Sequence, residues 1–331
     1  MKKNFLALLG LVLTLQLSAQ VSTVKPDATN VVATVSSTLP TVSHTGSTVN
    51  YVRTFDFYKA LTSTGSLTTE IAADNVMQAT QYFDGLGRPV QTVARKASGE
   101  GHDMVSFMVY DEYGRQVYQP MPYVATGISD GRMQLNPTAG QGLFYKGTTT
   151  NPGHFHEEDI FYSKTEFEAS PLNRALKVTG AGNKWTDEAR GVSTQYLTNT
   201  TNEGVRNWTV PATGNPTSNA YLPGELSKTV TTDENGNQIK EFTNLIGQVV
   251  LKQVQNDTVV AEGHTDWLNT YYLYDNYGNL RYVLPPRAVE LLYAGANNWA
   301  WIANSDFTFA YEYDGRNRMI SKKVPGAGEV H

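Results

Sequence analysis

Short stretches in which apolar and polar residues alternate follow one another along most of the chain. A period of two places successive side chains on opposite faces, which is typical of strands in a half-buried sheet. The stretches that predict strands are 51–58, 79–83, 105–110, 160–168, 226–231, 271–274 and 307–313. Only 286–293, with a proline at its start and Ala-Val-Glu-Leu-Leu behind it, predicts a helix. The pattern therefore predicts an all-β fold with one short helix.

The N-terminus has a different pattern. Two lysines precede an apolar run over 5–15, and small residues stand at Ser18 and Ala19. These are the features of a secretory signal peptide, and the run is shorter than the ~20 residues that span a bilayer. We predict a cleavable signal peptide over 1–19 and a secreted or cell-surface protein with no membrane span after cleavage.

Two polar segments contain no predicted strand. Residues 20–49 are mostly Thr, Ser and Val and predict an extended leader. Residues 198–220 are rich in Asn, Thr and Pro and predict a loop or a domain junction.

One phrase recurs six times. It consists of an aromatic residue, Asp or Asn, two variable residues, Gly or Asn, a polar residue and an aliphatic residue, with some copies incomplete. The copies lie at 82–90, 110–117, 233–239, 244–250, 274–280 and 313–320. An Asp or Asn side chain accepts backbone N–H groups in an Asx-turn, and Gly or Asn three residues later tolerates positive φ. Each copy therefore predicts a β-hairpin turn.

Neighbouring hairpins are expected to stack, because a single hairpin is marginally stable. Six unrelated turns of similar chemistry are the alternative, which the shared aromatic and aliphatic flanks disfavour. The residues expected to form the turns are Asp84, Gly87, Asp111, Gly114, Asp233, Gly236, Gly247, Asp275, Gly278 and Asp314. In the copy at 244–248, Asn and Gln replace Asp and Arg, which predicts a looser or differently capped turn.

The recurring phrase resembles the YD repeat of RHS proteins, in which strand–turn–strand units form a hollow β-shell. Residues 50–221 also resemble the N-terminal domain of unknown function of RHS proteins from the Bacteroidota, on the phrases at 82–90, 168–174 and 180–185. Residues 222–331 resemble the first YD repeats. The resemblance implies an open part of an RHS-type shell made of antiparallel hairpins.

The same resemblance implies a function and partners. The chain is expected to be a non-catalytic structural part that encapsulates or presents a C-terminal effector, in toxin delivery or surface interaction. Its implied partners are the rest of the shell and the effector domain, with cell-surface or carbohydrate ligands as further candidates. Family members continue with more repeats and a variable C-terminal domain. We therefore expect this chain to be a fragment, with an unpaired sheet edge near Val324.

Composition favours a β protein, disfavours some classes of partner and excludes disulfides. The 19 Tyr outnumber the 12 Phe and 5 Trp together, and only 17% of residues are charged, which favours a β protein. The net charge of −5 disfavours nucleic acid and anionic membranes as partners. The absence of cysteine means that no disulfide supports the fold.

Few residues suggest catalytic or metal chemistry. His154, His156 and Glu158 would share one face of a strand and are a weak metal candidate, with a polar strand entry as the favoured interpretation. Without Cys or a Gly-x-Ser-x-Gly elbow, we expect no enzyme activity and no cofactor. The other internal histidines are expected to lie at the surface: His44, His102 and His264.

The tryptophans support an alternative function. Trp299 and Trp301 would project to one side of an extended segment and, with Trp185, Trp208 and Trp267, stack on sugar rings. A secreted carbohydrate-binding or carbohydrate-cleaving β protein would then show them in a groove beside carboxylates. Packing into the core is the favoured interpretation for these residues.

Overall fold

The computed structural model describes residues 38–44, 49–58, 76–148, 153–155, 157–187, 190–257, 261–293, 298–301 and 306–330. The predicted signal peptide and residues 20–37 of the predicted leader lie outside the described residues. At the end of that leader, Leu39 and Val42 pack against the first core, and the Val42 amide donates to Thr138 Oγ1 (3.1 Å).

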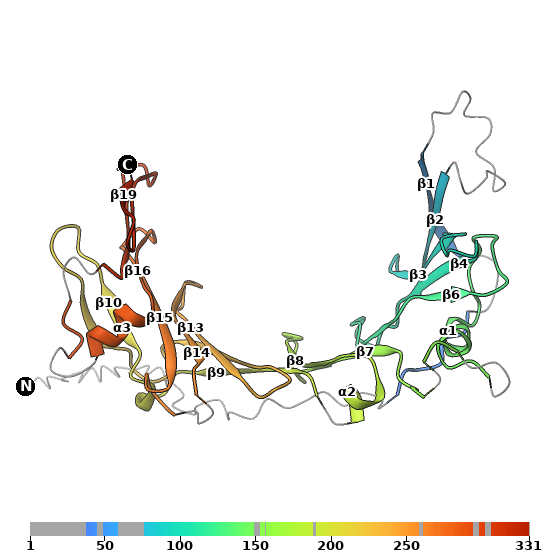
Figure 1. Ribbon diagram of the computed structural model, residues 1–331, viewed down its shortest axis with the longest axis horizontal. Coiled ribbons are helices and arrows are strands. Elements are labelled where there is room, and N and C mark those ends of the chain that lie inside the picture. The colour runs from blue at the N-terminus through green and yellow to red at the C-terminus, as the bar shows by residue number, and fades with distance from the viewer. Residues whose placement is uncertain are drawn as a thin grey trace, which may run out of the picture.

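Antiparallel strands form two main sheets, and together they give the chain the shape of a crescent (Figure 1). The first sheet has the order β1-β2-β3-β4-β6. Its strands are β1 (Asn50–Phe57), β2 (Val76–Phe83), β3 (Pro89–Arg95), β4 (Asp103–Phe107) and β6 (Tyr123–Ala125).

The second sheet has twelve strands in the order β19-β18-β17-β16-β15-β14-β13-β12-β9-β8-β7-β5. These strands are β5 (Tyr118–Pro120), β7 (Tyr162–Phe167), β8 (Ala175–Thr179), β9 (Val192–Thr198), β12 (Ser227–Thr232), β13 (Gln238–Thr243), β14 (Val249–Gln255), β15 (Trp267–Tyr274), β16 (Leu280–Leu284), β17 (Phe309–Tyr313), β18 (Met319–Val324) and β19 (Gly328–Val330). The order follows the sequence, so each strand is placed by the turn before it. The sheet is also continuous across residue 221, the predicted domain boundary.

The all-β prediction is confirmed, with more helix than expected. The described residues contain α1 (Pro137–Tyr145), α2 (Asn183–Asp187) and α3 (Pro286–Tyr293), of which only α3 was predicted. The sequence pattern did not predict α1 because the segment contains two glycines, and glycine disfavours a helix. Packing explains Gly140, since a Cβ there would come within 2.7 Å of the Tyr123 hydroxyl oxygen. The sheet does not end at the strand that contains Val324, where the sequence predicts an unpaired edge. One further strand, β19, pairs with β18.

The segment predicted as a loop or junction, 198–220, is ordered structure. It continues from β9 into η2 (Thr201–Glu203), β10 (Arg206–Thr209) and β11 (Thr217–Ala220), and the last two form a separate hairpin. We call residues 200–225 the insertion. Its polar composition hid it, because β10 and β11 bury only Trp208 among their eight residues.

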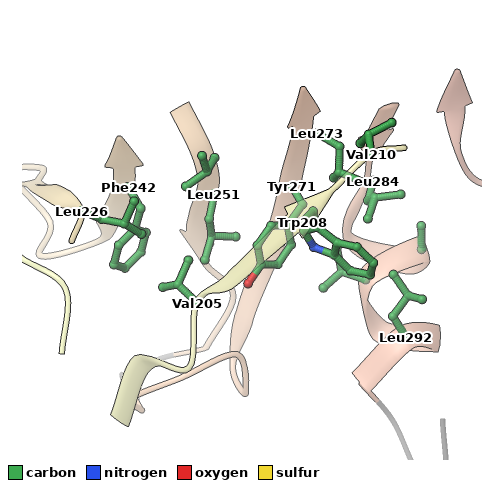
Figure 2. Packing of buried hydrophobic residues seen from close by; sticks show 13 residues of the cluster. Val205, Trp208, Val210, Leu226, Phe242, Leu251, Tyr271, Leu273, Leu284 and Leu292 are labelled. Carbon is green, nitrogen blue, oxygen red and sulfur yellow. The ribbon is translucent and has the colours of Figure 1, made fainter. Parts of the chain in front are cut away.

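Each main sheet has one apolar face that is covered in part by elements outside that sheet. Over the second sheet, β10 and α3 pack against β15, and Trp208 lies beside Tyr271 (Figure 2). The core beneath them includes Phe242, Leu251 and Leu284, each no more than 1% exposed. Burial of this apolar area supplies the main stabilisation of a strip that would otherwise expose both faces.

Over the first sheet, segment 128–135 is held by buried polar side chains. The Asp103 carboxylate accepts the Gly131 N–H (2.6 Å), and the Gln91 amide both accepts from and donates to the backbone of Gln134 (2.7 and 3.0 Å). Asp103 and Gln91 are fully buried. Their hydrogen bonds satisfy groups that would be costly to bury unpaired, and fix the segment across the sheet.

His264 is not the surface histidine that the sequence predicted. Its ring stacks on Tyr271 and contacts Trp299, with 2.8 Å between His264 Nε2 and the Tyr271 hydroxyl oxygen. Burial, together with the nearby Arg206 charge, lowers the pKa of His264 to about 4. His264 is enclosed only because other elements fold over the sheet. Its polar neighbours in the sequence do not predict this.

Candidate functional site: a rim of capped turns

The predicted turn residues form one repeated arrangement, illustrated by the copy after β2. Asp84 Oδ1 accepts the N–H groups of Leu86 and Arg88 (both 2.9 Å), and Oδ2 accepts from Arg88 Nε (2.8 Å). The Gly87 N–H donates to the Asp84 carbonyl (3.0 Å), and Gly87 has φ +76°. One carboxylate thus binds two backbone donors and a guanidinium, which closes the turn within five residues.

The same bonds occur in all six copies. In each copy the capping side chain accepts N–H groups from the residues two and four positions later, at 2.8–3.2 Å. The residue three positions later has positive φ in every copy: Gly87, Gly114, Gly236, Gly247, Gly278 and Asn317.

The turn at Asn244 is differently capped, which is one of the two outcomes that the sequence predicts, and its backbone bonds match those of the other copies. Its Oδ1 accepts from Ile246 (3.2 Å) and Gln248 (2.9 Å). An amide can also donate, so Asn244 Nδ2 binds Gln248 Oε1 (3.0 Å) where the other copies have an acid bound by Arg or Asn. The replacement of both partners preserves the geometry.

Five of the six copies lie on one side of the molecule. Because all strand pairs are antiparallel, β2, β4, β7, β9, β13, β15 and β17 all run in the same direction, and turns that follow them share one edge. We call this edge the turn rim. The copy at Asp233 follows β12 and lies on the opposite edge.

Two further members of the turn rim were missed in the sequence. After β7, the Glu168 amide donates to the Arg174 carbonyl (3.0 Å), and its carboxylate binds Arg174 Nε and Nη2 at 2.6–3.0 Å. The turn is two residues longer than the others, and Asn173 supplies the positive φ (+53°). Phe167 before the acid and Arg174 after it are the sequence features that could have identified this turn.

After β9, Asn199 occupies the capping position. Its N–H donates to the Leu226 carbonyl (3.1 Å), and its Oδ1 accepts the Leu226 N–H (2.9 Å). These are the bonds that join an acid to the fourth residue after it in the short turns. The insertion therefore emerges from a turn of the rim and leaves the strand pairing between β9 and β12 intact.

Five of the seven turns of the rim are accompanied by a β-bulge. The register shifts by one residue at Phe83, Phe167, Thr243, Tyr274 and Tyr313, each just before its turn. The pairing between β9 and β12, beside the turn at Asn199, has no shift. The pairing between β12 and β13, closed by the Asp233 turn, has no such shift. An extra residue on one strand bends the strand and increases its twist. Repetition of the bulge at one edge therefore contributes to the curvature seen in Figure 1.

Neighbouring turns are joined through aromatic side chains. The Tyr110 hydroxyl donates to the Pro89 carbonyl (2.9 Å), just after the preceding turn. The equivalent bonds run from Tyr274 to Val249 (3.1 Å) and from Tyr313 to Leu280 (3.1 Å). Further contacts along the rim place Arg88 over the Tyr110 ring, Arg115 over Phe167 and Arg174 over Tyr196, at 4.3–4.9 Å. The aromatic residue of the phrase thus couples one hairpin to the next.

The predicted metal candidates do not come together in the described structure. Residues 154, 155 and 157 lie in turns, and 158–160 are irregular rather than the expected strand, because the backbone of Phe155 bonds back to Tyr145 at the end of α1. The His154 ring contacts Phe144 at a tilt, whereas Glu158 accepts the Asn183 N–H (2.5 Å). His156 lies outside the described residues, and the described part of the chain holds no cluster of three His, Cys, Asp or Glu suited to a metal.

The tryptophans pack into the structure rather than into an exposed groove. Trp208 and Trp267 are buried, and the rings of Trp299 and Trp301 both contact Trp208. Trp299 has φ +65°, so this segment is not extended as expected. Only Trp185 is substantially exposed (41%).

A hollow of about 740 Å³ lies between β6, segment 126–136 and α1. Its lining includes Ile128, Leu143 and Phe144, together with Asp130 and Arg132. It contains none of the residues predicted from the sequence to act. In the described parts of the chain, no helix is long and apolar enough to cross a bilayer.

Comparison with known proteins gives one family match and several structural similarities. Residues 53–198 match the model of a domain of unknown function, DUF6443. No curated protein sequence matches the chain.

Three solved structures illustrate the structural similarity. The crystal structure of TcdB2-TccC3-Cdc42 is 17% identical (TM-score 0.48), and that of TcdB2-TccC3-TEV is 19% identical (TM-score 0.47). The Photorhabdus luminescens Tc holotoxin pore with a TccC3 mutation is 17% identical (TM-score 0.47). In each case the similarity covers 77% of this chain and 11% of the other, so the chain spans about a tenth of their length.

Replacement of Gly278 by Val is expected to destabilise the second sheet by roughly 2 kcal/mol, because Gly278 has φ +84° and a β-branched residue is strained there. Urea unfolding of the full chain measures the effect. Gly315→Val is the matched control, since Gly315 lies in a turn with negative or extended φ and has open space around it. Equal losses in the two variants would contradict the assignment of strain.

Removal of one aromatic hydroxyl tests the coupling between turns. Tyr274→Phe is expected to cost about 1 kcal/mol, because it leaves the Val249 carbonyl without its donor. Tyr272→Phe, on the same strand but outside this row of bonds, is the control. Hydrogen exchange should show faster opening of the turns at 244–248 and 275–279 in the first variant only.

Acid is expected to weaken the turn at Glu168. Hydrogen bonds from Arg174 lower the pKa of Glu168 to about 2, against an ordinary value of 4.5. Its stabilisation is therefore complete above about pH 5 and is lost as the pH falls from 4.5 to 2. Glu168→Gln should be less stable than the parent at pH 7, by on the order of 1–2 kcal/mol.

The stability gap between Glu168→Gln and the parent should shrink toward pH 2 in urea titrations. Glu166→Gln, two residues away and 3.7 Å from Lys164, is the control. A gap for Glu168→Gln that stays constant over this range would show that protonation of the carboxylate is not responsible.

Proposed function

We propose that the chain is a wall-forming, non-catalytic part of a larger secreted RHS-type protein. In this proposal its curved sheet encloses or presents another polypeptide, an effector domain that acts in toxin delivery or at a surface. The single observation that carries the proposal is the turn rim, in which one local arrangement extends a sheet by two strands at a time and adds a bulge at the same edge.

The geometry suits a wall for a physical reason. Each short turn closes within five residues, so strands can be added without altering the register of those already placed. The bulges bend the sheet, and a sheet that bends steadily can surround a volume. A continuous sheet also pairs its own backbone groups, which leaves few openings for water or proteases.

Export through a cleavable signal peptide is part of the proposal. It rests on the basic, apolar and small-residue pattern of residues 1–19. The absence of cysteine makes the fold independent of oxidation. Hydrogen bonds and apolar packing alone would stabilise the wall outside the cell.

The test is isolation of the native product. Antibodies against residues 76–330 would recover the protein from culture medium, envelope and cytosol of the producing cell, for mass determination and electron microscopy. We expect an exported product heavier than 36.5 kDa that forms a hollow particle with a protease-protected segment. A cytosolic product, or an open particle that protects no other polypeptide, would overturn the proposal.

A further inference from the structure

The tips of the turn rim carry large apolar side chains that face solvent. Between 66% and 92% of each side chain is exposed, although turn tips are usually polar or glycine. The tip residues are Leu86, Tyr113, Leu172, Leu222, Leu245, Ile246 and Tyr277. Six consecutive turns contribute to this set, and the seventh, at Asp314, has Arg316 instead.

In the described part of the opposite edge, large apolar side chains are exposed only singly, as at Tyr58, Trp185 and Phe307 (41–64% exposed), and not in successive turns. Its turn at Asp233 carries Glu234 and Asn235 at the tip, and its turn after β3 carries Ser98 and Glu100. Both edges meet the same demands of chain reversal, so turn formation does not explain the apolar residues. A row of exposed large apolar side chains along one edge marks an interaction surface.

We infer that the turn rim is a self-association surface, on which a second copy of this chain docks rim to rim. The inference is independent of the enclosing role proposed above. Three properties of the rim favour a second copy as the occupant: its area, its charge and its periodicity.

The area suits a stable dimer. Side chains of this size and exposure present on the order of 100 Å² each, so the row offers about 700–1,000 Å² per copy. Standard stable interfaces bury about 800 Å² per partner. A single tip would be too small, and the full row is sufficient.

The charge of the rim does not oppose the approach of an identical surface. Four capping acids are each bound by an arginine of their own turn: Asp84 by Arg88, Asp111 by Arg115, Glu168 by Arg174 and Asp314 by Arg318. The charges of these pairs cancel locally. The other charges in the turns are few, on Glu112, Glu225, Asp275 and Arg316, so two rims would meet with little like-charge repulsion.

The periodicity makes the rim complementary to itself. Neighbouring turns are two strands apart, which corresponds to about 10 Å along the rim. Under a two-fold axis at the centre of the row, the turn at Asp111 faces the partner copy's turn at Asp275. The turn with the insertion is central and faces its own copy, so Leu222 lies near the axis.

Light scattering and sedimentation of the signal-free chain, residues 20–331, test the inference. We expect a dimer at micromolar concentration. A variant carrying Leu86→Asn, Tyr113→Asn, Leu245→Asn and Ile246→Asn should dissociate at least tenfold more readily, and asparagine is well tolerated in turns. The control, Ile239→Thr with Leu268→Thr, changes exposed apolar residues on strands and should remain dimeric.

Because the chain has no cysteine, single replacements report the geometry of the dimer. Leu222→Cys should form an intermolecular disulfide readily, and Leu86→Cys, far from the axis, should not. A monomeric parent chain, or a rim variant that dimerises like the parent, would overturn the inference. Sedimentation of a monomeric parent chain with zwitterionic lipid vesicles would assign the rim to a membrane surface instead and would likewise overturn it.

Discussion

The structure depends on one local interaction, the acceptance of two backbone N–H groups by the side chain at the first position of each turn. The two donors lie two and four residues later, and the residue between them adopts positive φ. This closes the chain on itself within five residues and determines where the next strand begins. Strand order and register follow from that starting point.

Repetition converts this local rule into a long-range shape. A single bulge would bend one hairpin, whereas bulges at one edge of successive hairpins bend the whole sheet. Tyrosine hydroxyls and arginine side chains then couple each turn to the next, so a bend at one hairpin is passed to its neighbour. The insertion shows how far the rule extends, because Asn199 keeps the same bonds while 26 residues leave the rim between it and Leu226.

A curved sheet alone would leave both of its faces exposed to water. Apolar packing on one face adds stabilisation that the hydrogen bonds between strands do not supply. Two separate clusters of buried side chains lie under α1 with segment 128–135 and under the insertion with α3. Buried polar groups hold these covers in place, as Asp103 does for Gly131. The wall-like role that we propose needs both parts: turns that extend the sheet and covers that stabilise it.

The sequence by itself determined the fold class, the six turns and the helix at 286–293, because each depends on residues within a few positions of one another. An Asp, a Gly three residues later and flanking apolar residues carry their own geometry. Tertiary structure alone decided that five copies share a rim and that the copy at Asp233 does not, since this follows from strand direction. It also decided that Asn199 and Glu168 cap turns, because their partners are displaced by inserted residues. Trp208 is buried and His264 is partly buried only because elements distant in the chain fold over them. Burial of that kind is a property of the assembled sheet rather than of any local stretch of sequence.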